Sequence, residues 1–387
     1  MMKLFVIILL LASNFSEAKD KICLNMIVKN ESRVITRCLD SVLPIIDYWV
    51  IIDTGSTDKT QEIIKKHLKH IPGKLYQRPW KNFGHNRSEA FELAKSKGDY
   101  ILFMDADDTL EFEGAKEFPE LTHDLYNMWR GMPGFSYIKP QLVRADLPWK
   151  WVGVTHEYLD CAHTYSSETL KNVKYLSGNG GASSYDKEKF AKNVKLLTEG
   201  LKQEPDNSRY AFYLAESYRD AGDKAKALEW FQKRVDMGGW EEEVFWSKLQ
   251  IGHMLRALHM PSSIVIESYK LAHAYRPSRP EALYYLCDMY LDESRYEEAY
   301  QCLKARVPRA PSQRDTLFNE DWIEEYGFLF QLSICAYYTG HDQEALEACD
   351  RLLVLGEKLP EQWRKQTVKN RTFPAERLMQ SVAVGKK

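Results

Sequence analysis

The sequence lacks any CxxC pair of cysteines and carries little net charge. Its seven cysteines are scattered over 387 residues and their number is odd, so we interpret them as buried thiols, neither a disulfide framework nor a zinc site. The formal net charge of −2 gives no overall field that would attract nucleic acid or an anionic membrane. At 44% apolar and 28% charged residues, the composition is that of an ordinary globular protein with room for two or three domains.

Long apolar runs are also missing, except at the N-terminus. There an apolar run from Leu4 to Ala12 follows Lys3 and precedes a small-x-small sequence at residues 16–18. This is the layout of a cleavable secretory signal. As a helix the run would span about 14 Å, roughly half of a bilayer's hydrocarbon layer, so a membrane anchor is the less favoured alternative. We therefore expect a signal peptide over 1–18 and export, with a cytoplasmic location as the alternative.

Short apolar runs alternate with helical patterns between residues 21 and about 160. Strands are expected at KICLNMIV (21–28), YWVIID (48–53) and ILFM (101–104), with helical patterns after the first two. Strand-helix-strand repetition at these lengths predicts an α/β fold with a mostly parallel sheet covered by helices. In such sheets ligands bind at the carboxyl ends of the strands.

Three acids directly follow the third of these strands, in ILFMDADDTL (101–110). The carboxylates of Asp105, Asp107 and Asp108 repel one another unless a positive group lies among them. Hard divalent cations prefer oxygen ligands, and a short Asp-x-Asp can offer one carboxylate to a metal. A metal that also touches a diphosphate neutralises charge on the departing phosphate oxygen. The pattern therefore favours a metal site.

The segments ICLNMIVKNES, VIIDTGSTDKT and ILFMDADD, in this order, resemble family 2 glycosyltransferases with the GT-A fold. Such enzymes transfer a sugar from a nucleotide diphosphosugar with inversion at the anomeric carbon. Residues 21 to about 185 carry the resemblance, and we expect the GT-A domain, a nucleotide-diphosphosugar transferase-like fold, to occupy 19–186.

The resemblance implies a donor site at the ends of the first two strands. Asp53 would accept a hydrogen bond from the nucleobase, and backbone groups near Val28, Asn30 and Glu31 would shape the base pocket. Arg87 would meet the base or a phosphate. For Asp53 and Arg87 the alternative is a surface turn residue or a structural ion pair.

The resemblance also implies a metal between protein and donor. Asp105 would approach the ribose or the metal, and Asp107 would bind Mn²⁺ or Mg²⁺ through the donor's diphosphate. Asp108 is interpreted as a helix cap or as a supporting residue behind the ligands.

The acceptor side is expected at WKWVGVTHEYL (149–159), which resembles the segment that closes the sheet near the acceptor. An inverting transfer needs a base to take the acceptor's proton. Glu157 is our choice, and His156 could be a base or a third metal ligand. The alternative is that His156 and Glu157 form a structural ion pair beneath Trp151.

Beyond about residue 187 the pattern is purely helical. Residues 211–231, 283–303 and 329–349 share one template that begins three residues before each segment, with a small residue at its eighth position and Ala227, Ala299 or Ala345 at its twentieth. A weaker unit lies at about 246–277. The segments resemble tetratricopeptide repeats, which we expect at 187–370, followed by a C-terminal tail at 371–387; an irregular helical bundle is the alternative.

The repeats should also present a concave face to partners. We expect the aromatic residues Tyr210, Tyr213, Tyr284 and Tyr285 there, for a homodimer, a protein partner or a peptide-like acceptor, with core packing as the competing explanation.

The favoured function is a metal-dependent inverting glycosyltransferase with a UDP-linked donor and a glycan, lipid or protein acceptor. One alternative is a tetratricopeptide-type binding protein with an inactive transferase domain. Another is a nucleotidyltransferase, against which the lack of a Gly-rich phosphate loop after the first strand argues.

Overall fold

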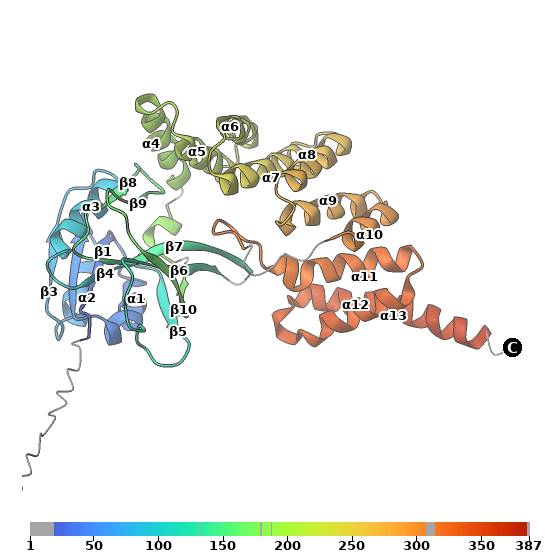
Figure 1. Cartoon of the computed structure of the whole chain (residues 1–387), viewed down its shortest axis with the longest axis horizontal. Coiled ribbons are helices and arrows are strands. Elements are labelled where there is room, and N and C mark those ends of the chain that lie inside the picture. Colours follow the sequence, from blue (N-terminus) through green and yellow to red (C-terminus); the bar gives the residue numbers. More distant parts are fainter. Residues whose placement is uncertain (1–18, 133, 179, 187, 307–313, 385–387) are drawn as a thin grey trace, which may run out of the picture.

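A computed structural model describes residues 19–132, 134–178, 180–186, 188–306 and 314–384 of the chain (Figure 1). The expected signal peptide at 1–18 therefore lies outside the described residues. Within these ranges, no helix is both long and apolar enough to cross a membrane.

The first half of the chain folds around an eight-stranded sheet with the strand order β3-β2-β1-β4-β7-β6-β10-β5. The strands are β1 (Ile22–Val28), β2 (Tyr48–Asp53), β3 (Gly73–Gln77), β4 (Tyr100–Phe103), β5 (Thr109–Phe112), β6 (Leu125–Met132), β7 (Phe135–Arg144) and β10 (Ser167–Leu176). Strands β3, β2, β1 and β4 are parallel, whereas β7 is antiparallel to β4. A separate hairpin pairs β8 (Trp149–Val152) with β9 (Tyr158–Cys161).

Helices cover both faces of this sheet because alternate residues of a strand point to opposite sides. Leu24 and Met26 of β1 pack in one core with α1 (Ile35–Val42) and α2 (Thr60–His67). Cys23 belongs to a second core on the other face, with α3 (Phe83–Ala94). A strand buried on both faces reads as a continuous apolar run, which is why β1 and β2 could be predicted from the sequence.

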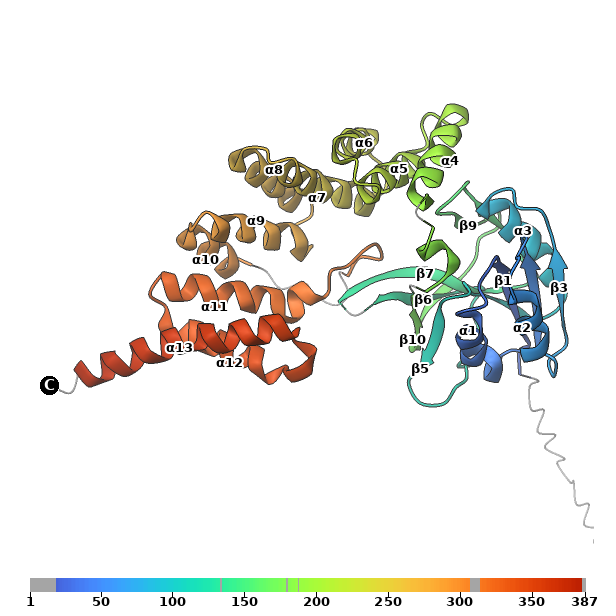
Figure 2. The same cartoon turned by 180° about the vertical axis from the view of Figure 1, so that it is seen from behind.

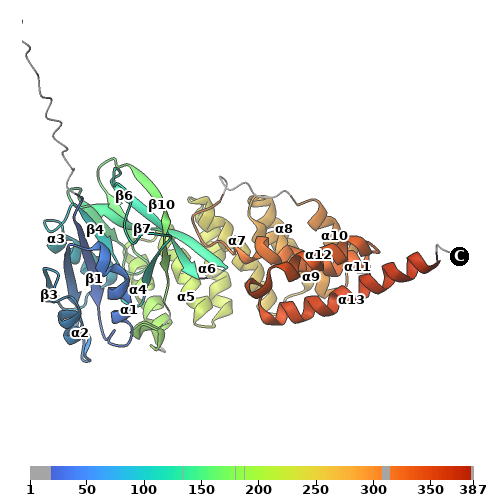
Figure 3. The same ribbon diagram turned by 90° about the horizontal axis from the view of Figure 1, so that it is seen from below.

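The second half of the chain consists of helix pairs (Figures 1 and 3). The helices are α4 (Lys189–Gln203), α5 (Ser208–Asp220), α6 (Lys224–Met237), α7 (Glu241–Ala257), α8 (Ser262–Tyr275), α9 (Pro280–Asp292), α10 (Tyr296–Lys304), α11 (Phe328–Tyr338), α12 (Asp342–Val354) and α13 (Glu361–Val384). The three template segments fall on α5/α6, α9/α10 and α11/α12, and the weaker unit falls on α7/α8. The template alanines Ala227, Ala299 and Ala345 are fully buried, as close packing between neighbouring helices requires. The predicted fold class is therefore confirmed.

The two halves meet again far along the chain. Residues 314–322, which precede α11, reach back to β7 (Figure 2). Ser136 and Asn319 form an antiparallel bridge, and the Ile138 amide donates to the Thr316 carbonyl at 2.7 Å. The helical half therefore completes one edge of β7.

The cysteines are free thiols, and five of the seven are buried, as interpreted from the sequence. Cys161 and Cys302 are half-buried. Burial raises the pKa of Cys23 to about 12, which keeps that thiol protonated at neutral pH.

Candidate active site

Asp53 ends β2 with one carboxylate oxygen occupied and the other free. Its Oδ1 accepts from the amides of Gly55 at 3.0 Å and Ser56 at 2.9 Å, and from Gln61 Nε2 at 3.1 Å. Its Oδ2 is buried and has no hydrogen-bond partner within the described residues. A buried acceptor without a donor is costly, so this oxygen suits a ligand N–H.

The loop after β1 lies against the loop after β2. The Val28 carbonyl accepts from the Thr54 amide at 2.9 Å. The Asn30 Oδ1 accepts from the Thr57 amide at 2.8 Å, and the Glu31 amide donates to Thr60 Oγ1 at 2.8 Å. The residues named for the base pocket are therefore gathered around the end of β2.

Two arginines lie among the acids that follow β4. Arg87 of α3 pairs with Asp105 Oδ1, and Arg130 of β6 donates to Asp105 Oδ2 at 3.1 Å. Arg130 also donates to Asp108 Oδ2 at 2.5 Å. The arginines therefore supply the positive charge that offsets the repulsion between Asp105 and Asp108.

These contacts separate the pKa values of the two acids. Burial works against ionisation, but Arg87, Arg130 and Lys139 hold the pKa of Asp105 well below its usual value. For Asp108, burial raises the pKa to about 6, with repulsion from Asp105 contributing and Arg130 opposing. Asp108 also accepts from the Gly178 amide at 2.8 Å, which is the supporting role expected for it.

Asp107 has the surroundings of a possible metal ligand. Its Oδ2 accepts only from the Gly181 amide at 3.2 Å, and within the described ranges its Oδ1 makes no hydrogen bond. Burial, with repulsion from Asp107, Asp58 and Asp105, raises the pKa of the neighbouring Glu31 to about 6, although the Ala182 amide opposes this. A nearby cation would relieve that repulsion.

Of these acids, Asp107 is therefore the one with an oxygen available to a divalent cation. Asp105 does not fit as a second ligand while both of its oxygens are paired with arginine. No cluster of three acidic, histidine or cysteine side chains with metal-binding geometry occurs in the part of the chain that the structure describes.

Arg87 joins the acidic edge to the predicted acceptor side. Its Nε lies 2.6 Å from Glu157 Oε1, and its guanidinium lies 5.4 Å from the Trp151 ring centre. Arg87 thus forms a structural ion pair, which was the alternative to a donor-binding role. Its expected contact with a base or phosphate stays a prediction. Glu157 pairs with Arg87 and not with His156, which differs from the ion pair considered for this segment.

His156 faces the helical half of the molecule. Its ring stacks on Tyr213 of α5, with ring centres 4.1 Å apart and an interplanar angle of 3°. The ring is solvent-exposed within the cavity, but desolvation by the surrounding walls, followed by the charge of Arg209, still lowers the His156 pKa. His156 is therefore neutral at physiological pH.

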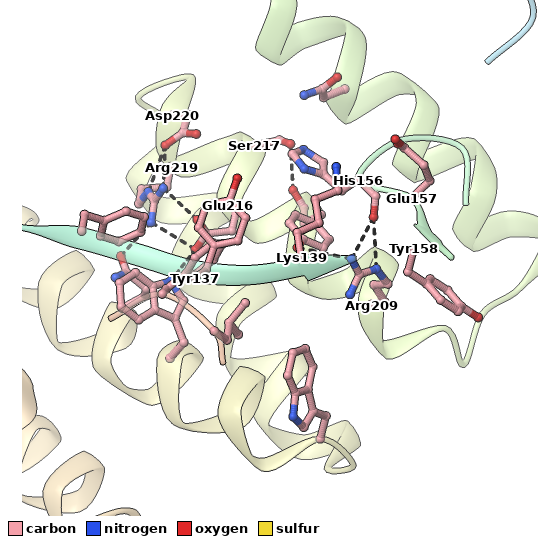
Figure 4. A pocket seen from close by; sticks show the side chains of 18 of the residues that line it. Tyr137, Lys139, His156, Glu157, Tyr158, Arg209, Glu216, Ser217, Arg219 and Asp220 are labelled. Atoms are coloured by element: carbon pink, nitrogen blue, oxygen red, sulfur yellow. Dashed lines mark hydrogen bonds and ion pairs between the residues drawn. The ribbon is translucent and has the colours of Figure 1, made fainter. Parts of the chain in front are cut away.

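A cavity of about 1040 Å³ lies between the sheet and the repeats (Figure 4). His156, Glu157 and Tyr158 stand at one end beside Arg209, and Glu216, Arg219 and Asp220 stand at the other. Its walls come from β7, the turn before β9, α4, α5, α7, α9 and residues 317–320. Glu157 thus belongs both to this cavity and to the ion-pair chain that reaches Asp105.

The four tyrosines expected on the inner face divide into two groups. Tyr213 and Tyr285 line the cavity, as predicted, although Tyr213 is also buried in the core of the repeats. The prediction is wrong for Tyr210 and Tyr284, which are buried in the core. Tyr210 lies close against Gly200 of α4, and the Tyr284 ring lies 4.9 Å from that of Trp322. Core packing, the competing explanation, describes these two.

Sequence reasoning missed two cations, Arg130 and Lys139. Lys139 lines the cavity from β7, and among the described residues its ammonium has no ion-pair or hydrogen-bond partner. Burial, followed by repulsion from Arg130, lowers its pKa to about 8. The available signal was a basic residue inside each of two otherwise strand-like segments, Arg130 in LYNMWRGM and Lys139 in FSYIKPQLVR.

With this geometry in place, the chain can be compared with known families. Residues 23–118 match the family model described as Glycosyl transferase family 2, and residues 183–238 match that of the Tetratricopeptide repeat. The chain therefore carries a family 2 glycosyltransferase domain followed by tetratricopeptide repeats. The first match includes β1, β2 and β4 with the acids that follow them.

Several curated proteins are similar to this chain. Glycosyltransferase SunS of Bacillus phage SPbeta is 26% identical over 224 residues, which are 54% of this chain and 52% of SunS. An uncharacterized glycosyltransferase of Rickettsia felis is 26% identical over 238 residues, 58% of this chain and 79% of the relative. The chain spans about half the length of the SunS proteins that it matches.

Solved structures resemble the chain in part. The crystal structure of MamA aligns with a TM-score of 0.36 at 17% identity, covering 46% of this chain and 95% of MamA. The structure of YrrB, titled a TPR protein with an unusual peptide-binding site, aligns with a TM-score of 0.35 at 13% identity, covering 47% of this chain and 84% of YrrB.

Proposed function

We propose that this protein is a metal-dependent inverting glycosyltransferase that moves a sugar from a UDP-linked donor to an acceptor bound in the cavity. The observation that carries the proposal is the position of Glu157. Its carboxylate lines the cavity, and a single arginine separates it from Asp105 at the sheet edge. A base and a donor-binding edge are thus adjacent.

The donor would bind at the ends of β1, β2 and β4. Asp53 Oδ2, a buried acceptor without a partner in the described residues, would accept from the nucleobase N–H. Asp107 would hold Mn²⁺ or Mg²⁺ together with the donor's diphosphate. When bound, the cation supplies positive charge to the leaving phosphate oxygens.

Glu157 would serve as the base. The acceptor hydroxyl attacks the anomeric carbon, its proton passes to the Glu157 carboxylate, and the bond to the diphosphate breaks as UDP departs. Arg87 orients Glu157 through the 2.6 Å ion pair. His156, which is neutral and stacked on Tyr213, is the less favoured base.

The repeats would take part in acceptor binding, because helices α5, α7 and α9 supply cavity walls. The acceptor class is a glycan, a lipid or a protein, and a protein partner or a second copy of the chain would bind through the repeats.

For the cellular location, we propose export through a signal peptide at residues 1–18, with a cytoplasmic location as the alternative.

One observation favours the alternative of a binding protein with an inactive transferase domain. Both oxygens of Asp105 are held by arginines, so this carboxylate is already neutralised. Active turnover by the purified protein would contradict that alternative.

The test is a donor screen with purified residues 19–387. UDP release is measured from several UDP-sugars with Mn²⁺, with and without candidate acceptors. Release that rises with one acceptor supports the proposal. A protein that binds no nucleotide diphosphate and releases no UDP from any donor would contradict it.

A further inference from the structure

The turn that carries Glu157 has a backbone conformation that needs external support. His156 has a φ of 50°, a left-handed value that residues other than glycine adopt only rarely. Gly153, four residues before Glu157, also has a positive φ of 117°. The direction of the Glu157 side chain depends on these two residues keeping their conformation.

Helix α5 of the first repeat supplies this support. Arg209 donates from Nε and Nη2 to the His156 carbonyl at 3.1 and 3.0 Å (Figure 4). One turn further along the same helix, Tyr213 stacks on the His156 ring. The backbone and the side chain of His156 are thus both held by one helix.

Arg209 is itself fixed from within the repeats. Its Nη1 lies 3.4 Å from the buried carboxylate of Glu243 on α7. Glu243 also pairs at 3.0 Å with Arg234 of α6, which is fully buried. A chain of charged groups therefore runs from the core of the repeats to the turn before β9.

We propose that Arg209 is a positioning residue for Glu157, so that the first repeat is part of the transfer centre and not only a wall for the acceptor. The inference rests on the proposed function, because it assigns the base role to Glu157. Arg209 acts by holding the His156 carbonyl, which fixes the peptide that leads into Glu157.

Hydrolysis of the donor without an acceptor separates this role from simple acceptor binding. Water then replaces the acceptor: it attacks the anomeric carbon, its proton passes to Glu157, and UDP leaves. The donor is UDP-glucose, UDP-galactose or UDP-N-acetylglucosamine, whichever the wild-type protein hydrolyses fastest with Mn²⁺. Arg209→Met should lower this hydrolysis by about 10-fold or more, since small displacements of a catalytic group have effects of this size. UDP affinity should stay unchanged.

Two further variants make the result specific. Arg209→Lys keeps a cation near the His156 carbonyl and should restore most of the hydrolysis. The thermal midpoint of unfolding of each variant shows whether it is folded. Arg256→Met removes an arginine of α7 that pairs with Asp288 and Asp292 outside the cavity, and it should leave hydrolysis unchanged.

A double-mutant cycle decides whether Arg209 acts through Glu157. In a Glu157→Gln background, Arg209→Met should have no further effect, because coupled residues are not additive. If Arg209→Met lowers hydrolysis equally in the wild-type and Glu157→Gln backgrounds, the inference is overturned. It is also overturned if Arg209→Met hydrolyses the donor normally and only its KM for the acceptor is raised. If the wild-type protein binds no nucleotide diphosphate and releases no UDP from any donor, with or without an acceptor, the proposed function fails and this inference with it. Normal UDP release by both wild type and Arg209→Met defeats the inference alone.

Discussion

Asp105 and Asp107 are two positions apart in the sequence, yet their carboxylates have different surroundings. Asp105 is held by Arg87 and Arg130, while among the described residues Asp107 accepts a hydrogen bond from a single backbone amide. One acid therefore supports the structure of the edge, and the other is available to a ligand. This difference allows separate predictions for the two residues.

Asp107→Asn should reduce UDP release by at least about 10²-fold, the scale for losing one electrostatic group that stabilises a transition state. UDP binding by the wild-type protein should require Mn²⁺ or Mg²⁺ and should be lost in EDTA. The measurement is UDP affinity by calorimetry and turnover by UDP release, with the metal restored after chelation as the control. Full activity in EDTA or in Asp107→Asn would contradict the metal-dependent proposal.

Asp105→Asn should instead lower the stability of the protein. It leaves Arg87 and Arg130 without their shared carboxylate, and breaking a largely buried ion pair costs on the order of 3 kcal/mol. The free energy of unfolding in urea measures this, and Asp107→Asn is the matched control, with an expected change below about 1 kcal/mol. Similar losses for both variants would contradict the different roles given to these residues.

Glu157→Gln should keep UDP affinity while sugar transfer falls by about 10²- to 10⁴-fold, because only the transfer step needs the base. The readouts are UDP binding and acceptor-dependent UDP release. His156→Ala is the comparison, and the reverse pattern would assign the base to His156. If neither variant affects transfer, the base lies elsewhere.

At the scale of elements, the sequence predicts what local patterns determine. Strands β1 and β2 and the helix pairs of the repeats follow from apolar runs and from the template alanines. Helix α13 runs from Glu361 to Val384 with Pro374 inside it, so it passes through residue 370, where we expected a tail to begin.

Contacts between distant elements could not be predicted. Arg130 reaches Asp105 because the strand order places β6 next but one to β4, with β7 between them. The pairing of β7 with residues 316–319 leaves no signal in either segment. The candidate site was therefore predicted as a set of acids with Arg87, and the places of Arg130 and Lys139 among them appear only in three dimensions.

For the whole molecule, the repeats are part of the cavity and of the edge of β7. A protein that ends near residue 187 would lose Arg209 and Tyr213 and would leave the amides of Ser136 and Ile138 without partners. We expect it to fold poorly or to lose acceptor transfer, while any remaining donor hydrolysis depends on metal. Size-exclusion chromatography and transfer assays measure this. A truncated protein that is monomeric like the full chain and transfers equally well to the same acceptor would contradict the expectation.

The return of residues 314–322 to β7 also bears on how the protein is made. Ser136 donates to Asp321, 185 residues further along the chain. At ribosomal rates of about 5–20 residues per second, the partner of β7 is synthesised roughly 10–40 s after the strand itself. During that interval the nascent sheet has an unpaired edge of the kind that aggregating chains add to. A ribosome-bound chain should therefore recruit chaperones until Asp321 has emerged from the exit tunnel, and release them soon afterwards.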